Sequence, residues 1–222
     1  MIKKDLLIDN ILAILWGENS SKLFVAVHGN MSHKADAPIS ILAEEAVSLG
    51  YQVLSFDLPQ HGDRKNESTP CKVQNCVSDL CKIIHYAQTK TDDISLFAFK
   101  KIPLRQCLFL SPVVNMERII NNMMNWFNVS EEQLNTEQEI LTPIGQILYW
   151  DYYCYVKENP ITRWNSPTAI LYGKEDNICE YDIVSSFSKD FSCDLEVMEN
   201  GEHYFHTAEH LSFYRQWLAD HL

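Results

Sequence analysis

ISLFAFKKIPLRQCLFLSP, residues 94–112, is the stretch that decides how this chain folds. It holds two apolar runs, residues 94–99 and 104–110, each with the length of a buried strand. Four residues, 100–103, lie between them. Parallel neighbouring strands need a crossover of about a dozen residues or more, usually a helix. The two runs therefore either pair antiparallel, or the connection expected between parallel strands has been shortened here.

The sequence on both sides of this stretch alternates between strand and helix patterns. Nearly continuous apolar runs, typical of strands covered on both faces, occupy residues 22–27, 51–58, 168–173 and 193–198. Helical spacing of apolar residues occupies residues 40–49, 73–87, 181–191 and 208–218. This alternation predicts an α/β fold with a mostly parallel, doubly wound sheet, locally shortened or rearranged around residues 99–104.

Two further segments complete the predicted organisation. Asp9-Asn10 lies between apolar runs at residues 6–8 and 11–16 and suits the positive φ angles of a tight hairpin turn. Residues 115–155 are helical in pattern and rich in aromatic side chains. We therefore expect a single domain over residues 1–222, with a small helical lid inserted at about residues 115–160. Its aromatic residues could line a pocket, but core packing is the simpler expectation for most of them.

Composition excludes several classes of function. The net charge of -12, from 30 acidic and 18 basic residues, disfavours a nucleic-acid or anionic-membrane partner. No stretch is long and apolar enough to span a bilayer. Seven scattered cysteines cannot form a complete disulfide framework, so we expect reduced thiols in a cytoplasmic protein. Cys71, Cys76 and Cys81 recur every five residues, a spacing that does not keep three side chains on one helical face. We therefore do not expect these cysteines to form a metal site.

Four short segments follow predicted strands and carry polar, chemically reactive residues. They are HGN at 28–30, FDLPQHGDR at 56–64, YGKED at 172–176 and ENGEHYFH at 199–206. Ligands of open α/β sheets bind at the carboxyl ends of the strands, so the four segments should converge on one crevice. As an ordered set they resemble the α/β-hydrolase superfamily, particularly its small bacterial esterases and serine peptidases. The resemblance extends over nearly the whole chain.

By this resemblance, Asp176 matches the acid of a catalytic triad and His203 matches its base. The acid precedes the histidine, as in the chain order of that family. In this chemistry the histidine takes the nucleophile's proton, while a buried carboxylate fixes its tautomer and stabilises the imidazolium. Glu175 could replace Asp176, and His206 could replace His203. Both matched residues could also be ordinary loop residues.

The segment His28-Gly29-Asn30 resembles the family's oxyanion loop. Glycine lets the backbone pass close to a substrate, and the Asn30 N–H would be one donor to a developing oxyanion. The same three residues could instead form only a strand-to-helix turn.

Metal chemistry is a weaker interpretation of the second segment. Asp57, His61 and Asp63 have side chains and a spacing suited to a metal ion. The family's turn explains these residues more simply. We therefore expect neither a metal nor a cofactor.

The family's nucleophile is missing from the sequence. It normally sits on a strained Gly-x-Ser-x-Gly turn between a strand and a helix. This motif occurs nowhere in the chain, and no glycine lies between Gly62 and Gly145. Residues 94–97 resemble the strand before that turn, and residues 99–103 resemble the end of the helix after it. An elbow and most of a helix are thus inferred to be missing, which predicts a stability defect or a rearrangement.

Other nucleophiles are not expected to substitute. Ser111 ends a predicted strand, but Pro112 follows it, so a strand-end turn serine is the simpler interpretation. Cys107 lies within a predicted strand and resembles a small buried apolar residue. Cys154 and Cys179 have no partnered base that the sequence reveals.

The resemblance implies a serine hydrolase of small esters, thioesters or amides, with a small-molecule acyl substrate. Because no nucleophile turn is present, we expect this activity to be impaired or absent. The alternative is a catalytically silent relative that binds a small ligand or a protein in the same crevice. An internal deletion from an ordinary hydrolase is a third explanation for the same gap.

Overall fold

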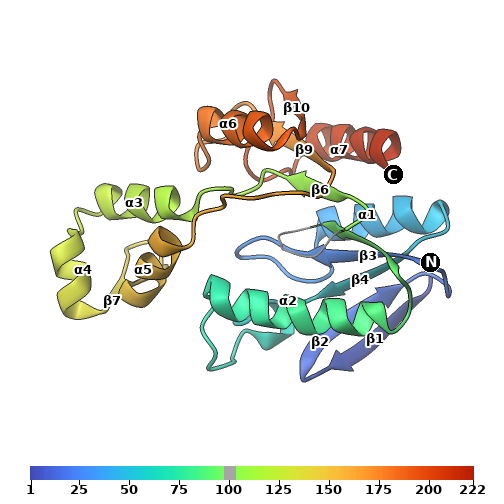
Figure 1. Cartoon of the computed structure of the whole chain (residues 1–222), viewed down its shortest axis with the longest axis horizontal. Helices are drawn as coiled ribbons and strands as arrows, with labels where there is room; N and C mark the ends of the chain where they lie inside the picture. Colours follow the sequence, from blue (N-terminus) through green and yellow to red (C-terminus); the bar gives the residue numbers. More distant parts are fainter. Residues whose placement is uncertain (98–103) are drawn as a thin grey trace.

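The computed structural model describes residues 1–97 and 104–222, and it centres on one eight-stranded sheet (Figure 1). The strand order is β1-β2-β4-β3-β5-β6-β9-β10. The strands are β1 (Lys3–Ile8), β2 (Ile11–Trp16), β3 (Lys22–Val27), β4 (Gln52–Phe56), β5 (Asp93–Phe97), β6 (Cys107–Leu110), β9 (Thr168–Gly173) and β10 (Asp194–Met198). Strand β2 pairs antiparallel with β1 and β4, and all other neighbours in this sheet are parallel. The predicted α/β fold class is confirmed.

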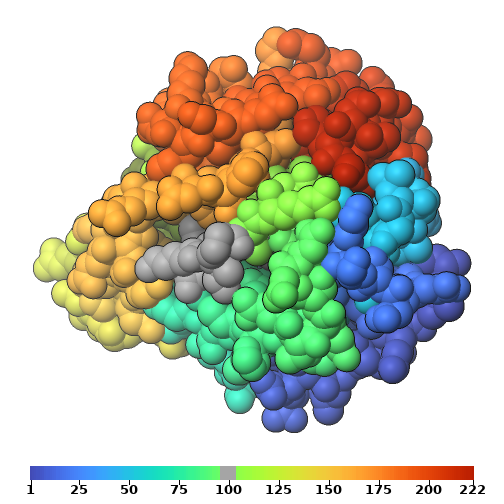
Figure 2. All heavy atoms as spheres, turned by 45° about the vertical axis from the view of Figure 1, so that its right-hand side comes forward, coloured from blue at the N-terminus to red at the C-terminus, as the bar shows by residue number. Residues whose placement is uncertain are grey.

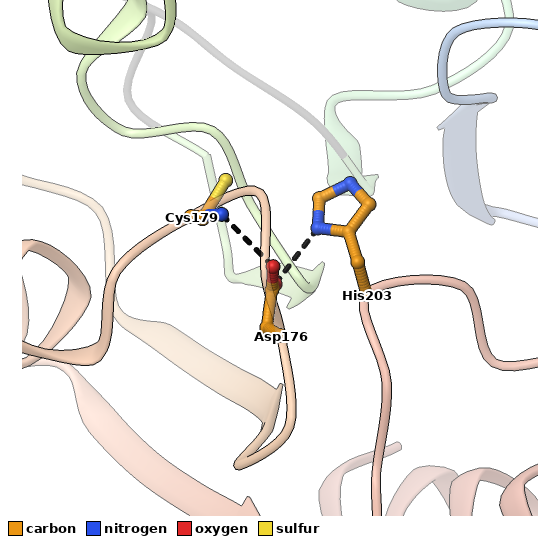
Figure 3. A group of neighbouring side chains, drawn as sticks. All are labelled: Asp176, Cys179 and His203. Carbon is orange, nitrogen blue, oxygen red and sulfur yellow. Dashed lines mark hydrogen bonds and ion pairs between the residues drawn. The ribbon is translucent and has the colours of Figure 1, made fainter. Parts of the chain in front are cut away.

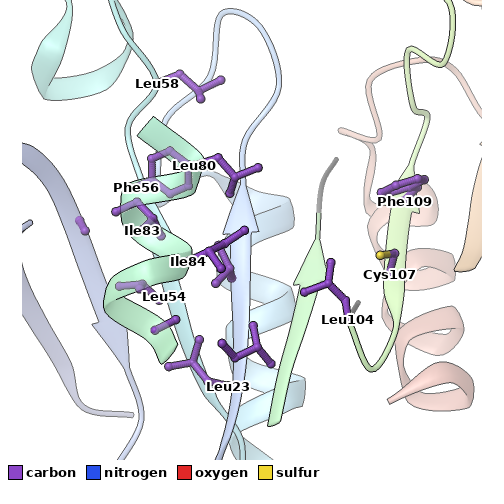
Figure 4. Close-up of a cluster of buried hydrophobic side chains, with 14 of the residues drawn as sticks. Leu23, Leu54, Phe56, Leu58, Leu80, Ile83, Ile84, Leu104, Cys107 and Phe109 are labelled. Carbon is purple, nitrogen blue, oxygen red and sulfur yellow. The ribbon is translucent and has the colours of Figure 1, made fainter. Parts of the chain in front are cut away.

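Helices cover both faces of the sheet, as a doubly wound fold requires. One face carries α1 (Ala37–Ser48) and α7 (Ala208–His221), and the other carries α2 (Val73–Gln88) and α6 (Tyr181–Phe191). On the α2 face, Leu80 and Ile83 pack with the strand residues Leu23 and Phe56 (Figure 4). The N-terminal hairpin turns at Asp9 and Asn10 with φ angles of 47° and 68°, as predicted.

Helices α1 and α7 lie side by side over the central strands, and the two are in contact at the right of Figure 2. Their buried side chains share one core with Phe24 of β3, Leu108 of β6 and Leu171 of β9. At the helix–helix boundary the Arg215 guanidinium bridges Glu44, at 2.8 Å, and Glu45. These two helices therefore close one face of the sheet over β3, β6 and β9.

The seam between β5 and β6 is narrow. In the described part of the chain, Leu96 with Cys107 is the one registered pair of the two strands. Beside it, the Arg105 N–H donates to the Ile94 carbonyl at 3.2 Å, and Leu104 packs into the core (Figure 4). The pairing is parallel, so the antiparallel alternative is wrong. Cys107, the first residue of β6, pairs with Leu96, the last residue but one of β5. Strand β6 therefore begins almost level with the end of β5, so a short connection is enough.

Some predictions about this seam lie outside the described residues. They are the end of the first apolar run, residues 98 and 99, and the linker at 100–103. The second run is a shorter strand than expected, because residues 104–106 precede β6 and do not belong to it.

The inserted segment, residues 115–160, projects from the sheet (Figure 1). It contains α3 (Met116–Trp126), α4 (Glu131–Glu137), α5 (Trp150–Glu158) and a hairpin of β7 (Glu139–Leu141) and β8 (Ile147–Tyr149). The sequence did not predict this hairpin. The segment has its own small core, which includes Leu134, Leu148 and Tyr153. No helix in the described residues is both long enough and apolar enough to cross a membrane.

Candidate active site

The structure brings Asp176 and His203 together at the carboxyl ends of β9 and β10 (Figure 3). His203 Nδ1 lies 2.7 Å from Asp176 Oδ2. The Asp176 side chain is fully buried, and its other oxygen accepts the backbone N–H groups of Ile178 and Cys179, each at 2.8 Å. Three partners thus fix the carboxylate, which holds His203 in the Nδ1–H tautomer. His203 Nε2 has no hydrogen-bond partner among the described residues, so it is free to act as a base.

The sequence alternatives do not share this position. The Glu175 side chain is exposed, while its backbone N–H donates to the Gly201 carbonyl at 2.8 Å. The His206 side chain is also exposed, and its Nδ1 lies 2.7 Å from the Tyr204 carbonyl oxygen.

Two glycines allow the acid loop and the histidine loop to meet. A Cβ atom on Gly173 would lie 2.5 Å from the backbone of Gly201, and one on Gly201 would lie 2.8 Å from Gly173 Cα. Both distances are shorter than any ordinary carbon–carbon contact. Each position must therefore be glycine for Asp176 and His203 to approach each other.

Cys179 lies beside the pair but remains a thiol. Asp176, Cys179 and His203 offer three atoms within 4.8 Å of one another, the one such trio that could hold a metal among the described residues. Burial, with Asp176 nearby, raises the pKa of the Cys179 thiol to about 12. A protonated thiol is a poor metal ligand and a poor nucleophile. The hydrogen bonds already described account for the arrangement without an ion.

His28 supports the candidate oxyanion loop from within. The Leu58 N–H donates to His28 Nε2 at 3.0 Å, so the ring proton sits on Nδ1, which donates to the Gly29 carbonyl at 2.7 Å. Burial lowers the pKa of His28 and keeps the ring neutral. Both ring nitrogens are thus used by the backbone, and His28 positions the loop instead of facing a substrate.

Gly29 and Asn30 have the features that an oxyanion loop needs. A Cβ atom on Gly29 would meet no atom within 4 Å, which indicates open space beside this backbone. The Asn30 N–H has no acceptor in the described part of the chain. The Asn30 side chain contacts His61 Nε2 at 3.1 Å, and that nitrogen also accepts the Met31 N–H at 3.0 Å.

Asp57 and Asp63, two of the residues considered for a metal, take part in hydrogen bonds and ion pairs that hold two loops together. Asp57 is fully buried, forms an ion pair with Lys34, and accepts the N–H groups of Lys34 at 2.8 Å and Asp63 at 3.1 Å. Gly62, with φ 53°, is required here because a Cβ atom would lie 2.3 Å from the Asp57 carboxylate. The carboxylate therefore joins the loops after β3 and β4 and leaves little capacity for an ion.

Ser111 has features that the sequence did not reveal. It follows β6 with φ 42°, a strained value for a residue other than glycine. Its N–H donates to the Leu171 carbonyl of β9 at 2.9 Å, and its hydroxyl is buried without a partner among the described residues. A strained backbone with an unpaired hydroxyl is a recognised mark of functional positions. Neither property leaves a sequence pattern, which explains why it was missed.

One small cavity borders the acid loop. A cavity of about 10 Å³ lies between the start of the inserted segment and α6, lined by residues that include Val113 and Cys179. This volume suits about one water molecule. The segment is tied down there, because Glu180 accepts hydrogen bonds from Arg118 Nε at 2.9 Å and Asn122 Nδ2 at 3.1 Å.

Comparisons with known proteins bear on this arrangement. No family model matches the chain, and no curated protein sequence matches it significantly. Solved structures are similar to it in fold. Est1E from Butyrivibrio proteoclasticus, solved with bound ferulic acid, has a TM-score of 0.79 at 18% identity over 98% of this chain and 97% of its own.

Two further structures agree in fold. A putative hydrolase from Agrobacterium vitis S4 has a TM-score of 0.76 at 11% identity, over 99% of this chain and 98% of its own. Mouse alpha/beta hydrolase domain-containing protein 10 has a TM-score of 0.76 at 12% identity, over the same shares. At these identities the similarity is one of architecture, and architecture alone does not fix activity. The chain has the α/β-hydrolase fold.

Proposed function

We propose that this chain binds a small acyl compound, an ester, thioester or amide. His203, oriented by Asp176, acts as the general base in the attack on this compound. The observation that carries this proposal is the 2.7 Å contact between His203 Nδ1 and a fully buried Asp176 carboxylate. A carboxylate buried with three hydrogen-bond partners is well suited to orient a histidine and to stabilise its protonated form. His203 Nε2 would then take a proton from the attacking group.

The Asn30 N–H supports the other half of the proposed chemistry. It lies after β3 at the carboxyl edge of the sheet, where the Asp176 and His203 loops also lie. It is unpaired within the described residues, and Gly29 leaves room beside it. One such donor contributes about 10²–10³-fold to acyl transfer when it meets the developing oxyanion.

We propose that turnover is nevertheless strongly reduced. The sequence has no Gly-x-Ser-x-Gly turn. Ser111, whose hydroxyl is buried and unpaired in the described structure, is followed by Pro112, which has no N–H to act as the second oxyanion donor. An attack by Ser111 would thus lack a donor that the family's nucleophile turn provides. Direct activation of water by His203 is the simpler residual route.

The second candidate function is a catalytically silent binder of a small ligand or a protein. The acid and histidine loops fit both candidate functions and do not discriminate between them. The missing nucleophile turn favours the silent binder, because binding needs no nucleophile. They differ in one respect, namely whether His203 changes a rate or only an affinity.

The test compares three purified proteins: the wild type, His203→Ala, and His206→Ala as a control at an exposed neighbouring histidine. Hydrolysis of an activated ester such as p-nitrophenyl acetate should fall by roughly 10²-fold in His203→Ala and stay unchanged in His206→Ala. A fluorophosphonate probe should not label any serine stoichiometrically.

Stoichiometric labelling of one serine would refute the reduced turnover and identify a nucleophile. Equal rates in wild type and His203→Ala, in protein that circular dichroism shows to be folded, would refute the base role. Binding of the ester's acid product in that case would leave the silent binder as the function.

A further inference from the structure

Helix α2 begins beside two thiols that the proposed active site does not use. Cys71 Sγ and Cys76 Sγ lie 3.6 Å apart, and both residues are partly exposed. Lys72 is the N-cap of α2, so Cys71 precedes the cap and Cys76 is the fourth helical residue. These two positions often hold a pair of apolar residues that fixes the entry of the chain into a helix. Here the pair consists of sulfur atoms in contact.

The surroundings favour one thiolate beside one thiol. The hydrogen bond from Cys76 and, to a smaller extent, the one from His61 lower the pKa of Cys71 to about 5, although partial burial acts in the opposite direction. The same hydrogen bond and burial raise the pKa of Cys76. The hydrogen bond with Cys71 raises the pKa of His61, and Arg64 adds positive charge nearby. The amino terminus of α2 also favours an anion at Cys71.

We propose that Cys71 and Cys76 form a reactive dithiol, which a peroxide oxidises to a disulfide. The Cys71 thiolate attacks one oxygen of hydrogen peroxide, the O–O bond breaks, and a sulfenic acid forms as hydroxide leaves. The Cys76 thiol gives its proton to that hydroxide, which forms water, and the Cys76 sulfur then attacks the Cys71 sulfur. The S–O bond breaks and hydroxide leaves again, taking a proton from solvent. Two thiols and one peroxide thus yield one disulfide and two waters.

The chain provides its own reference thiols. Cys81 lies in the same helix and is exposed, while Cys107 is buried in β6. Burial raises the pKa of Cys107 to about 12. Accessibility alone would make Cys81 the most reactive thiol in α2. The proposal predicts instead that Cys71 reacts first, because thiolate character, more than exposure, controls the rate.

The first experiment alkylates the reduced full-length protein with iodoacetamide at pH 6 and follows each cysteine by peptide mass. Cys71 should react roughly tenfold faster than Cys81. This figure combines its larger thiolate fraction with the lower nucleophilicity of a more acidic thiol. Equal rates, or a faster Cys81, would overturn the proposal.

The second experiment treats the Cys81→Ser protein with one equivalent of hydrogen peroxide. Trypsin cuts after Lys72, between the two thiols, so the peptides that carry Cys71 and Cys76 stay joined only through a disulfide. The expected product is this joined pair, lighter by two hydrogen atoms and separated by dithiothreitol. In a Cys76→Ser, Cys81→Ser protein, Cys71 should accumulate as a sulfenic acid that dimedone traps. A merely structural sulfur contact would give neither product, and unlinked sulfinic acid at Cys71 would also overturn the proposal.

Discussion

The corner between β9 and β10 and the seam between β5 and β6 lie in one sheet but are built differently. At the corner, five residue pairs are in register, two glycine backbones are in contact, and a buried carboxylate has three partners. At the seam, the described residues supply one registered pair and one hydrogen bond from Arg105. The acid–histidine half of the candidate site is therefore held by many contacts, whereas the seam is held by few, although β5 itself has five registered pairs with β3 on its other side.

The two halves of such a site are therefore structurally separable. Asp176 and His203 depend on loops after β9 and β10, and these loops contact each other directly. They do not need an intact connection after β5 to keep their geometry. An acid–histidine pair in good geometry thus supports the presence of a base and is independent of whether a nucleophile is present.

Among single substitutions at the β9–β10 corner, Gly173→Ala should have a large effect on stability. The added methyl would lie 2.5 Å from the Gly201 backbone, so the acid and histidine loops must separate. We expect a loss of about 3 kcal/mol in the free energy of unfolding, from overpacking against rigid backbone. Urea unfolding measures it. Gly29→Ala is the control, because its methyl meets no atom within 4 Å, and a similar loss there would show that the corner is not special.

Leu104→Ala tests the seam. Leu104 is 7% exposed and packs into the same core as Ile170 of β9, which is 0% exposed. We expect a loss of about 2 kcal/mol for Leu104→Ala and about 4 kcal/mol for Ile170→Ala, because a loosely held segment can collapse around the cavity. Urea unfolding of both variants gives the comparison. Equal losses would mean that the seam is as rigid as the corner.

A pH titration of stability tests the role of His28 in the candidate oxyanion loop. The pKa of His28 is lowered by burial, so the unfolded chain takes up a proton first as the pH falls below about 6.5, the ordinary pKa of histidine. His28 therefore stabilises the fold above that pH and loses its contribution below it, on the order of 1 kcal/mol. The raised pKa of His61 acts in the opposite direction, so the difference between wild type and His28→Gln is the quantity to measure. A difference that is constant between pH 7.5 and 5 would contradict the buried neutral His28.

Arg215→Met should have the smallest effect. Its ion pairs with Glu44 and Glu45 join α1 to α7, but the Arg215 side chain is 43% exposed. Solvent screening limits the expected loss to about 0.5 kcal/mol, measured by thermal unfolding. Lys174→Met, which removes a more exposed pair with Glu199, is the matched control. A loss above about 2 kcal/mol would show that the two helices depend on this charge and not on apolar packing.

Much of the fold followed from local patterns in the sequence. The strands β3 and β9 and the helix α6 have the predicted bounds, because continuous apolar runs and helical spacing are clear there. The approach of the Asp176 and His203 loops followed from their places after strands, since parallel strands bring their carboxyl ends together. The choice of these two residues came from the resemblance to the α/β-hydrolase superfamily.

The rest depends on contacts that sequence patterns do not encode. The relation of β5 to β6 depends on register, and the offset between Leu96 and Cys107 is a tertiary property. The strained φ of Ser111 and the contact of the two glycines are also set by the surrounding structure. Cys71 lies before the N-cap of α2 and Cys76 lies within the helix. The spacing of five residues was assessed as if all these cysteines lay on one helix, so it did not reveal their contact.

The strand order has a consequence for engineering. Helix α2 joins β4 to β5, and a right-handed connection from β5 to β6 runs in the same direction along the sheet, so it lies on the face that α2 covers. A cassette carrying a strand end, a Gly-x-Ser-x-Gly turn and a helix, grafted between β5 and β6, would therefore add its helix to the α2 face and leave the packing of α1 against α7 intact. Restoring a nucleophile to this scaffold is thus a problem of extending one helical layer, with no need to part the opposite one.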